Sequence, residues 1–143
     1  MAYTNLNRVN QTIDGFDSII IMKEVADYPC GVTLDVTGVE DTVIKAGTPI
    51  LQNADGTKFV PVIVKDGEFE PASQMSAEDD APSLLGILKT TILTSEPLAP
   101  VLTMGTINAA AIEASLGAKL GDELVEQMKA QGIIPLYATK EVN

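Results

Sequence analysis

Short apolar segments separated by turn residues fill most of the chain. Residues 31–37 alternate apolar and polar side chains with period two, which predicts a strand with one face in a core and the other in water. Asp-Gly pairs at 55–56 and 66–67 are strong hairpin signals between further short apolar runs. The pattern predicts a meander of short antiparallel strands, at residues 18–22, 31–37, 42–51 and 58–64.

The most apolar part of the chain, residues 83–112, carries only two charges, Lys89 and Glu96. Its longest uncharged run, 97–112, is shorter than the ~18 residues that a membrane helix needs, and proline and glycine interrupt it. We instead expect strands that are apolar on both faces, at 84–88, 90–94 and 100–104. Such strands are covered on both sides, either by the core of the chain itself or by a second copy, and both interpretations remain open.

The pattern becomes helical after residue 105. Thr106 or Asn108 can cap a first helix that ends at Gly117, and Asp122 can cap a second helix that ends at Gly132. The expected helices cover about 107–116 and 122–131, and a last short strand is expected at 132–137.

Residues 1–17 are polar with scattered apolar positions, which predicts an extended, flexible N-terminal arm ahead of a single β-rich domain at 18–143. Residues 71–83 are acidic, bounded by proline and without periodicity, and predict a surface loop. The expected fold class is mainly β with α (β+α). We expect a small antiparallel β-barrel or sandwich of short strands, with one or two short helices near the C-terminus.

Charge and size narrow the classes of partner. A chain of 143 residues forms one domain with a core large enough to fold alone. Its 20 acidic and 9 basic residues give a net charge of -11, which opposes binding to nucleic acid or to an anionic membrane. The first residues lack the apolar region of a secretory signal. We therefore expect synthesis in a cytoplasm, no nucleic-acid or membrane partner, and a neutral or basic partner surface.

The side chains that carry catalysis are scarce. The chain has no histidine, the most common general base and metal ligand. The acidic pairs and triplets at 40–41 and 78–80 lack calcium-loop spacing, and no glycine-rich phosphate loop is present in the sequence. The single cysteine, Cys30, has no histidine to activate it and is expected to be a small buried residue. We expect no enzyme activity, no cofactor and no metal.

Five short motifs follow one another in order: AGTPI at 46–50, DGTKFVP at 55–61, DG at 66–67, LGIL at 85–88 and VLTMGTIN at 101–108. In this order they resemble the head decoration proteins of tailed bacteriophages and the related head-fibre proteins, over roughly residues 31 to 113. The resemblance implies a structural virion protein on the outer capsid surface of a DNA-filled head. It also implies a homo-oligomer, typically a trimer, that holds neighbouring subunits of the major capsid protein together.

With that function, two sets of contact residues are expected. Capsid contacts are expected in the N-terminal arm and in the loop around residues 48–49. The residues are Tyr3, Asn5, Leu6, Val9, Thr48 and Pro49. Contacts between copies are expected in the apolar segment, at Leu85, Ile87, Ile92, Val101 and Met104.

An alternative function is the base of a head fibre, or an adhesin-like binding module that recognises a host-surface ligand. Aromatic residues make up only 4% of the chain, so rings on which a glycan could stack are few. Binding to a glycan array distinguishes this alternative from a capsid protein.

Overall fold

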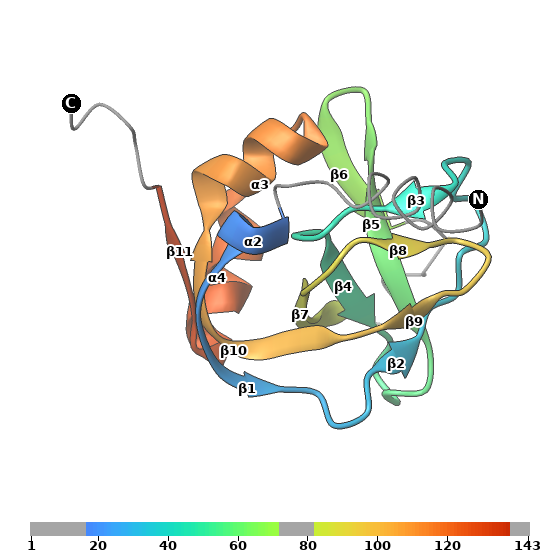
Figure 1. Cartoon of the computed structure of the whole chain (residues 1–143), viewed down its shortest axis with the longest axis horizontal. Helices are drawn as coiled ribbons and strands as arrows, with labels where there is room; N and C mark the ends of the chain where they lie inside the picture. Colours follow the sequence, from blue (N-terminus) through green and yellow to red (C-terminus); the bar gives the residue numbers. More distant parts are fainter. Residues whose placement is uncertain (1–16, 72–81, 138–143) are drawn as a thin grey trace, which may run out of the picture.

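Strands dominate the computed structural model, which describes residues 17–71 and 82–137 (Figure 1). The largest sheet has seven strands in the order β1-β10-β7-β4-β5-β6, with β11 also paired to β10. The pairings are antiparallel except that of β10 with β11, which is parallel. These strands are β1 (Ile21–Asp27), β4 (Pro49–Gln52), β5 (Phe59–Lys65), β6 (Glu68–Pro71), β7 (Ser83–Leu88), β10 (Val101–Asn108) and β11 (Ile133–Leu136).

Two small sheets and three helices complete the described part of the chain. The small sheets pair β2 (Val32–Thr33) with β9 (Leu98–Ala99), and β3 (Val43–Ile44) with β8 (Ile92–Leu93). The helices are α2 (Asp17–Ile20), α3 (Ala109–Leu116) and α4 (Asp122–Gln131). The expected class, mostly antiparallel β with two short helices late in the chain, is confirmed. The described strands do not close into a barrel, so that finer prediction is not confirmed.

The predicted hairpin at Asp66-Gly67 is confirmed, and it connects β5 to β6. Both residues have positive φ, 55° and 81°, as a two-residue turn between strands of natural twist requires. The β4–β5 turn is held by Asn53, whose Oδ1 accepts hydrogen bonds from the backbone N–H groups of Thr57 (2.9 Å) and Lys58 (3.1 Å).

The ends of α3 and α4 lie at or next to the residues predicted from the sequence. Asn108 caps α3 by accepting a hydrogen bond from the Ala111 N–H at 3.1 Å, and Gly117 ends the helix with φ 80°. The predicted cap of α4 is wrong by one residue, because Gly121 is the cap and Asp122 is the first helical residue. There the carboxylate still lies at the positive end of the helix dipole.

The expected strand at 18–22 is wrong for its first half, because residues 17–20 form α2 and β1 then runs on to Asp27. Bulges explain why the hydrophobic pattern did not predict the full length of β1. The pairing with β10 shifts between Ile21 and Lys23 and again between Glu24 and Ala26. Each extra residue reverses the inside-outside alternation, so the strand has no period of two to detect.

The alternation predicted at 31–37 is confirmed for residues 32–34, since Val32 and Leu34 are buried and Thr33 is exposed. Its ladder is shorter than expected, with only two residues in β2. Beyond β2, the backbone forms hydrogen bonds to segments that are distant in the chain. The Leu34 N–H donates to Pro97 O at 2.9 Å, and the Asp35 N–H donates to Phe59 O at 2.8 Å.

The buried apolar side chains of the described residues form two clusters. One lies between the helices and the large sheet and includes Ile20, Ile107, Ile112, Met128 and Ile133. The other is built from strands and includes Val32, Ile44, Leu85, Leu88 and Val101.

Strand β10 changes partner along its length, and α4 fills the resulting gap. Val101 and Leu102 pair with β7, whereas the residues from Gly105 onward pair with β11. Between them, Gln131 Nε2 donates to the carbonyls of Leu85 and Thr103. The glutamine thereby supplies hydrogen bonds where the β7–β10 ladder has ended, and buried carbonyls without such partners are costly.

Candidate interaction surfaces

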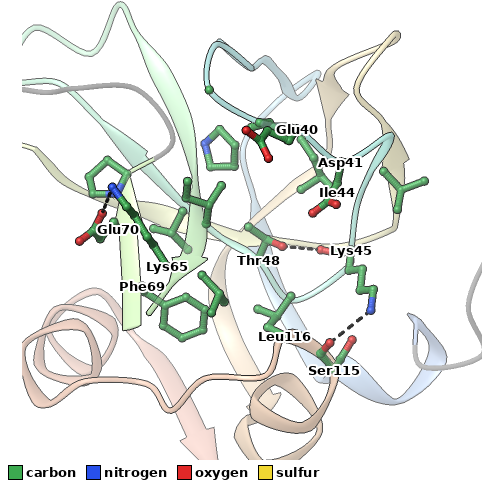
Figure 2. A pocket seen from close by; sticks show the side chains of 18 of the residues that line it. Glu40, Asp41, Ile44, Lys45, Thr48, Lys65, Phe69, Glu70, Ser115 and Leu116 are labelled. Carbon is green, nitrogen blue, oxygen red and sulfur yellow. Dashed lines mark hydrogen bonds and ion pairs between the residues drawn. The ribbon is translucent and has the colours of Figure 1, made fainter. Parts of the chain in front are cut away.

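Two surfaces of the described residues are candidates for binding: a groove and an uncovered face of the large sheet. The groove lies between residues 38–45 and the β5–β6 hairpin, and the end of α3 closes one end of it (Figure 2). It encloses about 820 Å³. Figure 2 shows Phe69 and Leu116 close together at one end and Glu40 and Asp41 at the other.

Most polar groups of the groove already have partners. Thr48 Oγ1 donates to Lys45 O at 2.7 Å, and Lys45 Nζ donates to Ser115 O at 3.3 Å. The second contact places a cation at the negative end of α3, where it is stabilising. Lys65 Nζ lies 4.0 Å from Glu70 Oε2, and both side chains are more than half exposed. Exposed pairs of this kind contribute little to stability.

The groove has the geometry of a binding site, with exposed carboxylates at one end. Glu40 and Asp41 lie on the loop before β3, and the hydroxyl-bearing residues Thr42 and Ser115 also line the groove. Among the described residues there is no group of three or more side chains that could hold a metal ion.

The second surface is the outer face of strands β1, β10 and β11, defined here by Lys23, Met104, Thr106, Ile134 and Leu136. The strand pairing places these residues on one side. Lys23 pairs with Thr106, Thr106 pairs with Ile134, and Met104 and Leu136 are two residues away along their strands. Met104 is 42% exposed, Ile134 52% and Leu136 43%.

Helices cover only the opposite face of these three strands. Ile107 and Ile133 point inward and are fully buried in the cluster that also contains Ile112 of α3 and Met128 of α4. Figure 1 shows the three helices gathered on that side. No described element covers the outer face, so its apolar side chains meet water in the single chain.

Strand β1 adds further exposed apolar residues at the edge of the sheet. Its bulge residues Met22 and Val25 have no partner on β10 and are 50% and 57% exposed. Lys89 reaches this strand, with Nζ 2.5 Å from Glu24 Oε1 and 3.1 Å from Asp27 Oδ2. The hydrogen bond to Glu24, followed by that to Asp27, raises the pKa of Lys89 above its ordinary value, and desolvation opposes the rise.

The residues expected to contact other copies divide into two groups. Leu85, Ile87 and Val101 are at most 6% exposed and belong to the core of the chain itself, so for them the core interpretation holds. Ile92 is half-buried and Met104 is exposed on the outer face. Only Met104 presents substantial side-chain surface to a neighbour.

The expected capsid contacts lie elsewhere. Tyr3, Asn5, Leu6 and Val9 fall outside the described residues. Thr48 is 3% exposed and Pro49 is fully buried, because both lie at the start of β4 under the surrounding loops. Their side chains offer a partner little surface in this conformation, although Thr48 lines the groove.

Sequence reasoning missed the outer face and misplaced the cysteine. Ile134 and Leu136 alternate with buried residues, but a short C-terminal strand does not reveal which of its faces a helix will cover. Cys30 was expected to be buried, and this is wrong: it is exposed in the turn after β1, with φ 64°. Its place in a turn keeps its side chain away from both clusters.

No helix among residues 17–71 and 82–137 is long and apolar enough to cross a membrane. Comparisons with protein-family models, with curated proteins and with solved structures give no match to this chain.

Proposed function

We propose that this chain is a structural protein of a tailed-bacteriophage virion, which binds the outer capsid surface as an oligomer and stabilises the DNA-filled head. The observation that carries the proposal is the position of the five motifs in the fold. They form the entry to β4, the β4–β5 turn, the β5–β6 turn, strand β7, and strand β10 with the cap of α3. All five therefore belong to one connected unit, the large sheet and its first long helix.

Charge and surface support the same role. A net charge of -11 keeps the chain away from packaged DNA and suits the outside of a shell. The apolar outer face of β1, β10 and β11 is surface that a protein neighbour can bury. The proposed partners are the major capsid protein and further copies of this chain, with the trimer taken from the resemblance alone.

Co-sedimentation with phage heads tests this function. The full chain is mixed with expanded and with unexpanded shells of a matching phage, and the bound protein is measured over a range of concentrations. Saturable binding to expanded shells supports the proposal. Absence of binding to both kinds of shell overturns it.

The N-terminal arm is the proposed capsid contact, and variants at its apolar positions test it. Replacing Leu6 and Val9 with Asp removes two side chains that docking would bury and adds charges that docking would have to desolvate. We expect at least about 100-fold weaker binding to expanded heads, since two such changes cost several kcal/mol. A double variant with Asp at Asn7 and Thr12 adds the same charge at polar positions.

Urea unfolding of both double variants is measured beside the binding, so that a loss of binding through a loss of the fold is recognised. Equal loss of head binding in the two double variants would attribute the effect to charge alone. Unchanged binding of the Leu6 and Val9 variant would exclude the arm as the contact.

The groove favours a second candidate function, a head-fibre base or adhesin-like module that recognises a host-surface ligand. Its volume of about 820 Å³ is that of small-molecule sites, and Glu40 and Asp41 provide exposed acceptors. Phe69 is the one aromatic residue among its lining residues, which limits stacking on a sugar. Specific signals on a glycan array, lost in a Glu40→Ala, Asp41→Ala variant, would support this candidate.

A further inference from the structure

We propose that the outer face of β1, β10 and β11 is the contact between copies of this chain, with the apolar side chains of neighbouring copies meeting around a symmetry axis. This inference deepens the proposed function by naming the surface that would build the oligomer. It differs from the expectation based on sequence, which placed most of the contact on β7 and the start of β10.

The face is apolar at its centre, and no described element of the chain covers it. Met104, Ile134 and Leu136 are 42–52% exposed, and they lie on adjacent paired strands rather than scattered over the surface. Gly132, beneath Met104, brings the backbone close, and a Cβ there would lie 3.0 Å from Met104 Cγ. The absence of a side chain at this position leaves room for the Met104 side chain beside the start of β11.

The distribution of charge permits a second copy as the occupant, and the proposal commits to it. A chain with net charge -11 repels its own copies over most of its surface, and contact between them requires a region that carries few carboxylates. Of the residues that define the outer face, Lys23 alone is charged, and it is a cation. Two copies that meet here bring together surfaces whose five defining residues include no carboxylate.

Strand β1 also carries both signs of charge close together. Lys23 projects on the outer face, while Glu24 and Asp27 lie on the same strand and are partly exposed beside Lys89. Because Glu24 and Asp27 are already paired with Lys89, β1 adds little uncompensated negative charge beside the outer face.

The exposed edge of β1 is not itself expected to pair with another strand. Its bulges interrupt the regular spacing of hydrogen-bonding groups, and a lysine lies in its middle. Both features are devices that prevent edge-to-edge association. The contact is therefore expected between faces, through side chains.

Sedimentation equilibrium of the full chain tests this inference. We expect the wild-type protein to show a mass that is a small multiple of 15.1 kDa at high micromolar concentration. Ile134→Asp would bury a charge in the contact and is expected to weaken association at least about 100-fold. Leu93→Asp is the matched control, because Leu93 is similarly exposed, at 46%, on β8 of a different sheet.

Three results would overturn the inference. They are a wild-type mass of 15.1 kDa at all concentrations, association that survives Ile134→Asp, and dissociation caused equally by Leu93→Asp. If Ile134→Asp fails to fold by circular dichroism, Leu136→Asp on the same face replaces it, with the same expected dissociation. Loss of head binding by an Ile134→Asp protein of unchanged mass would assign the face to the capsid instead, which separates this inference from the proposed function.

Discussion

Strands β7 and β1 flank the same strand, β10, yet their surroundings are opposite. Five of the six residues of β7 are buried, whereas six of the seven residues of β1 are exposed. β7 lies between β10 and β4 and is hydrogen-bonded to both glutamines of α4: the Leu84 N–H donates to Gln127 Oε1, and Gln131 Nε2 donates to the Leu85 carbonyl. β1 has a strand on one side only.

This difference teaches which apolar residues are available to a partner. The apolar strand β7, SLLGIL, is buried within the single chain at every residue except Ser83. In β1, Met22, Val25 and Ala26 are exposed, whereas Ile21 packs against the cluster beneath the helices. A partner surface is therefore better sought beside β1 than at β7.

The largest expected effect comes from adding a single methyl group to β7. A Cβ at Gly86 would overlap the backbone carbonyl of Leu102 and lie 2.7 Å from Val101 Cγ1. Because a backbone atom cannot move aside without breaking the β7–β10 pairing, Gly86→Ala should lower the free energy of unfolding by at least about 4 kcal/mol. Urea unfolding measures this loss. Ala26→Val on β1, which adds two methyl groups at an exposed site, should change the same quantity by less than about 0.5 kcal/mol.

Truncation of matched aliphatic residues gives the next largest effect. Ile87 is fully buried, so Ile87→Ala should lower the free energy of unfolding by about 3 kcal/mol through lost burial and a cavity. Val25 is 57% exposed, and Val25→Ala should cost less than about 0.5 kcal/mol in dilute solution. Similar losses in both variants would contradict the contrast between the two strands.

The smallest expected effect concerns the ion pairs that tie β1 to the loop after β7. Lys89→Met removes contacts to Glu24 and Asp27, which are about half exposed, and should cost about 1 kcal/mol near neutral pH. The pKa of Lys89 is raised in the folded state, so its contribution is complete below the ordinary pKa near 10.5. It declines as the pH rises through the raised value. The stability difference between wild type and Lys89→Met should therefore shrink in alkaline solution, and a difference independent of pH would exclude this role.

Local sequence signals predicted the parts of the fold that local chemistry decides. The Asp66-Gly67 hairpin and the caps of α3 at Asn108 and Gly117 depend on residues adjacent in the chain, and all were predictable. Even where the ladder was shorter than expected, the alternation at Val32, Thr33 and Leu34 gave the correct buried face.

Features that depend on distant partners were not predictable in the same way. The bulges of β1 are defined by its pairing with β10, which lies about 80 residues further along the chain. The parallel pairing of β11 with β10 requires the intervening helices to return the chain to the same end of the sheet. For the candidate contact, the sequence identified Met104 but not Ile134 or Leu136. Their exposure depends on where the helices place β11 against β10, which the local sequence does not show.

Amide hydrogen exchange of the full chain at low and high protein concentration tests the central claim most directly, that β1 and β11 are exposed only in the single chain. In dilute solution, the account predicts fast exchange in β1 and β11 and slow exchange in β7. At high concentration it predicts slower exchange in β1 and β11, with β7 unchanged. Equal exchange of β1 and β11 at both concentrations, while the sedimenting mass increases, would contradict the account and assign the contact to another surface.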